Sequence, residues 1–149
     1  MDTPEKSFRK DYIGNIRFEF FTNRGSLTIE AWCSTRNCRV STFNKGVGRR
    51  TEVKLTDDQW WKLVIPVAYS GFQKWEKRYD SHVSTGYAPS WSVSIMTKFD
   101  WYYSSGDGAF PDGFQKMLKG LVEFASEIEN TESAKVGGFL QSYLPATEA

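Results

Sequence analysis

Apolar and polar residues alternate along the first third of the chain, which is the pattern of half-buried β-strands. Asn15–Phe21 shows it first, and Ser26–Cys33 repeats it after a short turn signal. Cys38–Phe43 and Arg50–Leu55 follow as a third and a fourth strand. Because short turns join strands that are neighbours in the sequence, we expect an antiparallel meander.

The middle of the chain changes to helical spacing. Thr56 and Gln59 form a capping-box signal, and apolar residues recur at helical spacing from there to Tyr79. Pro66 removes a backbone donor inside this run, and Gly71 weakens it further. The pattern predicts a kinked helix, or two short helices broken near Pro66–Gly71.

Alternation returns in Trp91–Phe99, after an irregular loop at Asp80–Pro89, and predicts the clearest strand of the chain. Trp101–Tyr103 continues this strand or forms a short partner, and Ser104–Gly108 is expected to be a loop. Pro111 is predicted to begin the last helix, where its missing N–H costs nothing. Its apolar stripe comprises Phe114, Met117, Leu118, Leu121, Val122, Ala125 and Ile128.

This order predicts an α+β fold: an antiparallel sheet of five or six strands, with the interrupted helix and the C-terminal helix on one face. The 149 residues suit one domain, with an arm (1–14), a body (15–129) and a tail (130–149). The chain is rich in rings, with 6 Trp, 7 Tyr and 11 Phe. We expect a buried set of Phe18, Phe20, Trp60, Trp91 and Phe114. The burial of Trp32, Trp61, Trp101, Tyr102 and Phe139 stays open.

Composition bears on the cellular location, the state of the cysteines and the need for a metal. No apolar run is long enough to span a bilayer, and the charged N-terminus lacks the apolar core of a secretory signal, so we expect a cytoplasmic protein. Cys33 and Cys38 are then reduced thiols. With His82 as the only histidine, we expect no structural metal site and no cofactor.

The segment from Ser104 to Gly108 is the first candidate site. Ser104, Ser105, Gly106, Asp107 and Gly108 run from a strand toward a helix, so their backbone N–H groups could bind a small anion, with Trp101 beside them. The segment is neither a Walker loop nor a GxGxxG motif. The alternative is a tight connection that needs glycine dihedrals.

The basic N-terminal sheet is the second candidate site. Residues 1–50 carry ten Lys and Arg against five Asp and Glu, although the whole chain has a net charge of only +1. Single-stranded nucleic acids bind sheets that combine cations with stacking rings. The residues that would carry this function are Arg39, Lys45, Arg49, Arg50 and Trp32. The alternative is that the charges are the solvated face of an ordinary sheet.

Evidence for catalysis is thin. Asp80 and His82 lie in one loop beside Tyr79, where a histidine near a carboxylate could act as a general base. No serine or cysteine stands in a nucleophile motif. We therefore leave an enzyme as the third interpretation and assign no catalytic residue.

Two stretches resemble known families. Gly48–Leu63, with its basic turn, strand and capped helix, resembles the strand-to-helix junction of transcriptional-coactivator-type single-stranded-DNA-binding domains. That resemblance implies a four-stranded sheet and a helix that bind single-stranded DNA as a dimer. The chain departs from this pattern at Pro66, and about 70 further residues follow.

A longer stretch, residues 55–124, resembles a group of small uncharacterised bacterial α+β proteins. The shared elements are Trp75 and Tyr79 at the end of a helix, Trp91 opening a strand, and Phe110-Pro111 ahead of Phe114. This resemblance implies the fold but no activity.

The sequence thus favours a non-enzymatic binding protein. It would hold a small anionic ligand or a protein partner, or assemble as a homo-oligomer. The alternative is a protein that binds single-stranded nucleic acid through the basic sheet.

Overall fold

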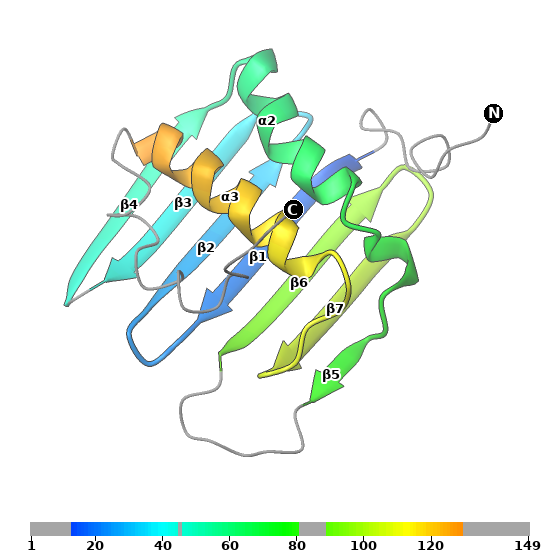
Figure 1. Ribbon diagram of the computed structural model, residues 1–149. Helices are drawn as coiled ribbons and strands as arrows, with labels where there is room; N and C mark the ends of the chain where they lie inside the picture. Colours follow the sequence, from blue (N-terminus) through cyan, green and yellow to red (C-terminus); the bar gives the residue numbers. More distant parts are fainter. Residues whose placement is uncertain (1–12, 45, 81–88, 130–149) are drawn as a thin grey trace.

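A computed structural model of the chain describes residues 13–44, 46–80 and 89–129 (Figure 1). The described part is α+β, as the sequence predicts. Its elements are β1 (Ile13–Phe21), β2 (Gly25–Trp32), β3 (Asn37–Asn44), β4 (Val47–Lys54), α2 (Asp57–Ala68), the 3-10 helix η2 (Phe72–Lys74), β5 (Arg78–Asp80), β6 (Ser90–Thr97), β7 (Trp101–Asp107) and α3 (Phe114–Glu129).

All the described strands join one sheet, in the order β4-β3-β2-β1-β6-β7-β5. The expected meander β1–β4 is present, and β1 lies at the centre because it also pairs with β6. The sheet has seven strands and is mixed, since β5 runs parallel to β7. The prediction of five or six strands, all antiparallel, was therefore wrong in the number of strands and in the direction of β5. The sequence missed β5 because three residues are too few to show alternation.

Both helices cover the same face of the sheet, and they lie side by side on it (Figure 1). The residues that the sheet turns toward them are buried, as the row Phe18, Ile29 and Val40 illustrates. Leu63 of α2 and Leu121 of α3 are fully buried. Burying one such side chain contributes about 1.5–3 kcal/mol, so this layer supplies most of the fold's stability.

The helix α2 begins as predicted and ends earlier than its apolar pattern does. Thr56 and Gln59 form the capping box. Pro66 lies inside the helix without ending it, and the chain leaves the helix just before Gly71, whose φ is 82°. The predicted break near Pro66–Gly71 is thus present, whereas the helical spacing up to Tyr79 was misleading because Tyr79 lies in β5.

One ring cluster joins the sheet to the start of α3. The ring of Phe114 lies 4.5 Å from that of Trp91 and 5.0 Å from that of Phe110, measured between centroids. Trp75 and Tyr79 each pack 6.1 Å from Trp91. The residues that carry the longer of the two resemblances therefore meet in the core, where they pack rather than bind.

The same cluster fixes the entry into the last helix. The indole N–H groups of Trp75 and Trp91 donate to the carbonyls of Asp112 and Ala109. The prediction that Pro111 begins the helix was wrong by three residues, because Pro111 accepts a turn hydrogen bond from Phe114, where α3 starts. The predicted stripe of α3 and the predicted buried ring set are confirmed.

Several predictions fall on residues outside the described ranges, among them Lys45, His82, Phe139 and most of the arm and tail. Among the described residues, neither helix is both long and apolar enough to cross a membrane.

Candidate functional site

The two faces of the sheet differ in how far they are buried. The helices bury one face, and the described residues leave the other uncovered. We call the second face the open face. Its side chains along the six long strands, apart from the buried Ser105, are exposed or half-buried. In β1, β2, β3 and β6 they alternate with buried positions, so the period-2 pattern of the sequence positions both the core and this surface there.

Charged side chains form a ladder across four strands in the middle of the open face. Glu30 accepts from Arg17 at 3.4 Å and from Arg39 at 3.3 Å. The ladder comprises Arg50, Glu52, Arg39, Glu30, Arg17 and Glu19. Hydrogen bonds from Arg39 and then from Arg50 lower the pKa of Glu52. Equal numbers of each sign leave the ladder with no net charge.

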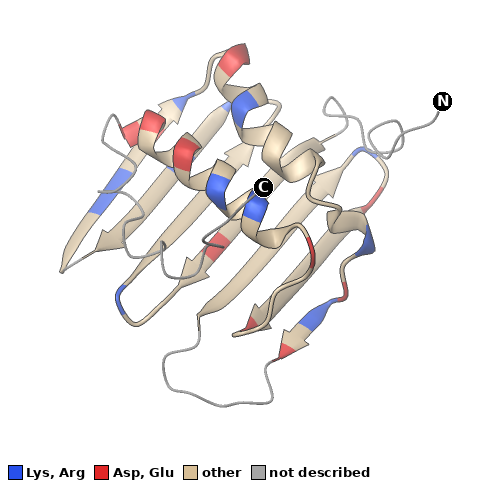
Figure 2. Cartoon of the chain, in the orientation of Figure 1, with Lys and Arg blue, Asp and Glu red and all other residues tan. Residues whose placement is uncertain are grey.

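The mixture of signs extends beyond the ladder. Figure 2 shows basic and acidic residues interspersed along the strands and helices rather than gathered on one element. Of the basic residues that the structure describes in the first 50 residues, Arg17, Arg36, Arg39 and Arg50 each form an ion pair with a carboxylate. An extended cationic track of the kind that follows a phosphate backbone is not formed by the described residues.

Large apolar side chains are grouped at one corner of the open face, which we call the apolar corner, while Phe21 and Phe43 are exposed at the far ends of β1 and β3. The apolar corner comprises Met96, Trp101 and Tyr103, with exposed fractions of 47%, 63% and 47%, and the turn between β6 and β7 adds Phe99, which is 68% exposed. Met96 and Trp101 are opposite each other in the β6–β7 register, and the rings of Trp101 and Tyr103 are 6.2 Å apart. Trp101 is held in place by its indole N–H, which donates to Ser94 Oγ at 2.6 Å.

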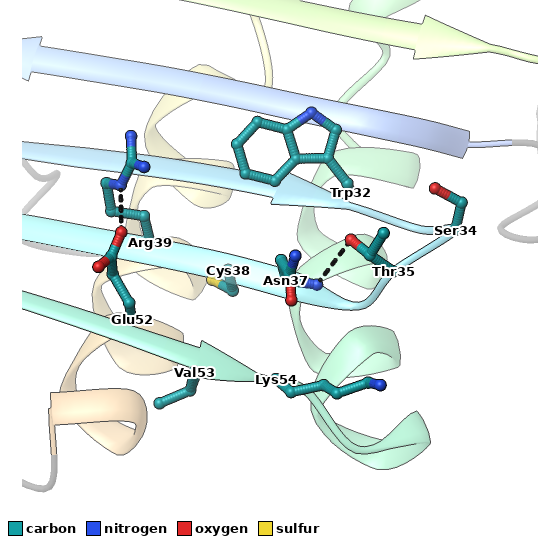
Figure 3. A pocket seen from close by; sticks show the side chains of 9 residues that line it. All are labelled: Trp32, Ser34, Thr35, Asn37, Cys38, Arg39, Glu52, Val53 and Lys54. Carbon is teal, nitrogen blue, oxygen red and sulfur yellow. Dashed lines mark hydrogen bonds and ion pairs between the residues drawn. The ribbon is translucent and has the colours of Figure 1, made fainter.

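A groove of about 570 Å³ crosses the ends of β2, β3 and β4 (Figure 3). Trp32 lies on one side of it, Lys54 on the other, and Asn37 between them, while the Arg39–Glu52 ion pair lies at one end. Within the described residues, no acceptor meets the Trp32 indole N–H and no carboxylate pairs with Lys54. We call this the Trp32 groove.

The nucleic-acid candidates are divided between these places. Trp32 and Arg39 both line the Trp32 groove. The nucleic-acid hypothesis needs such a ring with a cation near it. Arg50 belongs to the ladder, whereas the strand alternation turns Arg49 to the other face of β4, toward Glu129. The structure therefore does not bring Arg49 together with the other three.

The small-anion candidates lie in a strand instead of a loop. Ser104, Ser105, Gly106 and Asp107 belong to β7, and Gly108 follows it. The loop prediction was wrong because these small residues are needed for packing: a Cβ on Gly106 would lie 2.6 Å from Trp91 Nε1.

Their polar groups are already used inside the protein. The backbone N–H groups of Ser105 and Gly108 donate to Lys77 and Pro89. Ser104 Oγ donates to the carbonyl of Glu76 at 2.6 Å. An anion would therefore have to displace bonds that tie β7 to the segment before β5 and to the start of β6. Trp101, the sixth candidate of this set, faces the apolar corner instead.

The described residues offer few other candidate catalytic or metal-binding groups. Asp80 is paired with Arg78, which also pairs with Asp107. Burial raises the pKa of the Cys38 thiol to about 12, so this thiol is not a nucleophile at neutral pH. The described residues contain no group of three or more His, Cys, Asp or Glu side chains placed to hold a metal ion.

Neither a comparison with protein-family models nor a search of curated proteins found a match to this chain. Function is therefore inferred from the geometry alone.

Proposed function

We propose that this protein is a non-enzymatic interaction protein that docks another protein on its open face. The observation that carries the proposal is the apolar corner, where Met96, Trp101 and Tyr103 stand exposed on one face of the sheet. Aromatic residues and methionine are enriched in protein interfaces, and Trp and Tyr recur among the residues that dominate binding energy.

The size of the open face suits such a complex. Its six long strands have 7 to 9 residues each. Strands about 4.8 Å apart, with a rise of about 3.3 Å per residue, give it an area of roughly 750 Å². Each partner in a complex of standard size buries about 800 Å².

The charges favour a protein over a polyanion. The ladder beside the apolar corner is neutral, so it offers no long-range attraction for phosphates, while it can pair with polar groups at the rim of an interface. We expect a partner that presents an apolar surface to the corner and mixed polar groups to the ladder. The segment Ser104–Gly108 is less suited to binding, because its polar groups already form hydrogen bonds within the protein.

Site-specific photo-crosslinking in the cells that make the protein tests this. A photoreactive phenylalanine analogue replaces Tyr103, and in a matched control it replaces Tyr69, which is 60% exposed at the end of α2. We expect a discrete adduct with another protein from position 103, no such adduct from position 69, and loss of the adduct on adding Trp101→Ala. Equal adducts from both positions, no adduct from position 103, or an adduct with a second copy of this chain would overturn the proposal.

A second candidate, binding of single-stranded nucleic acid, is favoured by one observation. The Trp32 groove combines a partly exposed indole with Lys54, which no carboxylate neutralises within the described residues. A base stacked on Trp32 with its phosphate near Lys54 fits this arrangement.

Fluorescence anisotropy with a labelled oligothymidylate tests the second candidate. It predicts binding that weakens as salt rises and that falls with Trp32→Ala and with Lys54→Ala. Absence of binding at low salt, or binding that both variants leave unchanged, would exclude it.

A further inference from the structure

The outer edge of β4 is a different surface from the open face, and it is long and has no partner strand within the described residues. The strand order ends at β4, which has eight residues and pairs with β3 alone among the described strands. β4 contains no proline, and its pairing with β3 runs in one register without a bulge. The opposite edge strand, β5, has only three residues. A long, regular edge is a ready template for pairing with another strand.

The direction of its backbone groups follows from one hydrogen bond. Leu55 N donates to Arg36 O, which makes these two residues a hydrogen-bonded pair in the β3–β4 register. Hydrogen-bonded pairs alternate along an antiparallel ladder. Thr51 therefore turns its N–H and C=O groups toward β3. The residues that turn these groups outward are Gly48, Arg50, Glu52 and Lys54.

Charge and the length of the paired stretch together select one register for pairing with a second copy. Residues opposite each other in a continuous antiparallel sheet point to the same face, so a two-fold axis must pass through a residue. An axis at Arg50 opposes two arginines, and an axis at Glu52 opposes two glutamates, which is unfavourable. An axis at Thr51 places Arg50 of each copy opposite Glu52 of the other. An axis at Val53 also opposes unlike charges, Glu52 and Lys54, but it pairs only the last three residues of β4, whereas the axis at Thr51 pairs Gly48 to Lys54.

The same register also satisfies the backbone. It places Arg50 opposite Glu52 and Gly48 opposite Lys54, and all four turn their N–H and C=O groups outward. Each of these groups thus meets a partner, and the glycine leaves room for the lysine side chain. Backbone direction alone would equally allow an axis at Arg50 or at Glu52, since either also places outward-turned residues opposite each other. Side-chain charge and the length of the paired stretch are therefore what select Thr51.

We infer that β4 pairs antiparallel with β4 of a second copy about Thr51, which joins the two sheets into one and leaves both open faces free. The inference goes beyond the docking of a partner on the open face and does not depend on it. In this arrangement the partner copy's Gly48 lies beside Lys54, so the second strand closes the side of the Trp32 groove that lies beyond β4.

Sedimentation equilibrium on the full chain tests this. We expect the wild type to approach twice the 17.1 kDa of one chain as its concentration rises. Arg50→Glu and Glu52→Arg each oppose like charges twice, and each should weaken the dimer roughly tenfold or more. The double variant R50E/E52R restores opposite charges and should recover the dimer. A wild type that stays monomeric, or a double variant no better than the singles, would overturn the inference.

Proline at position 50 provides a test that does not depend on charge. Because the N–H of Arg50 points away from β3, Arg50→Pro should leave the fold intact, as circular dichroism would show, while it removes a donor to the second copy. Arg50→Ala keeps that donor and is the matched control. We expect the proline variant to be monomeric and the alanine variant to retain a weakened dimer. A dimer equally strong in both would exclude pairing through this edge. Crosslinking at Tyr103 is a separate readout, so the failure of one proposal leaves the other standing.

Discussion

Gly106 of β7 lies directly against the indole of Trp91 in β6, so close that a Cβ on Gly106 would stand 2.6 Å from Nε1 and 2.8 Å from the carbonyl of Tyr79. The strand β7 can therefore approach both β5 and the ring cluster only because this position has no side chain. A segment that looks like a flexible glycine loop in the sequence is in fact a packed strand.

Gly106→Ala should accordingly destabilise the protein by about 1–3 kcal/mol, the usual cost of forcing extra volume into a packed site. Urea unfolding measures this. Gly48→Ala is the matched control, since a Cβ there meets nothing closer than 3.6 Å. Equal stabilities of the two variants would contradict the packing described for β7.

Glu30 holds the middle of the charge ladder, because it accepts from both Arg17 and Arg39 and its side chain is only 17% exposed. Glu30→Gln should cost roughly 0.5–1 kcal/mol at low salt, and the loss should shrink at high salt. The control is Glu127→Gln. It breaks a single ion pair, the one with Lys62, and that pair is more exposed than those of Glu30. A loss that does not respond to salt would argue against a mainly electrostatic ladder.

The sheet's order could not have been predicted in full. Alternation marked β1, β2, β3 and β6, because each of these strands buries alternate residues, and it also marked β4, although the residues of β4 are exposed or half-buried. Nothing local in the sequence pairs β1 with β6, since that contact joins residues about 75 positions apart, as in Phe18 and Val93. β5 escaped notice because its three residues pair in parallel.

The candidate sites could likewise be predicted only as far as the pattern within single strands allows. Period 2 places Trp32 on the same face of β2 as Thr28 and Glu30, and the structure has it there. Arg49 and Arg50 were grouped because they are adjacent in sequence, and adjacency in a strand sends them to opposite faces. The apolar corner was missed as a cluster because Met96 and Trp101 meet only through the β6–β7 register.

Glu129, at the end of α3, should give the stability a distinct pH dependence. Burial raises its pKa, and the Thr42 hydrogen bond and the charge of Arg49 only partly oppose this. The folded state therefore binds this proton more tightly than the unfolded state, so stability falls as the pH rises from about 4.5 through the folded pKa. Glu129→Gln should remove that fall, so the free energy of unfolding of the variant should rise relative to that of the wild type as the pH approaches neutrality. Urea unfolding at a series of pH values measures this. Parallel profiles would contradict the raised pKa.

The central claim is that the open face, through its apolar corner, binds a partner protein. The most direct test is the affinity of the partner recovered through Tyr103 for the wild type, Trp101→Ala and Tyr69→Ala, measured by titration calorimetry. Trp101 and Tyr69 are similarly exposed, at 63% and 60%, so the two substitutions remove comparable surface. The account predicts that Trp101→Ala weakens binding roughly thirtyfold or more, as expected for a hot-spot residue, while Tyr69→Ala leaves it unchanged. Equal affinities of the wild type and Trp101→Ala would contradict it.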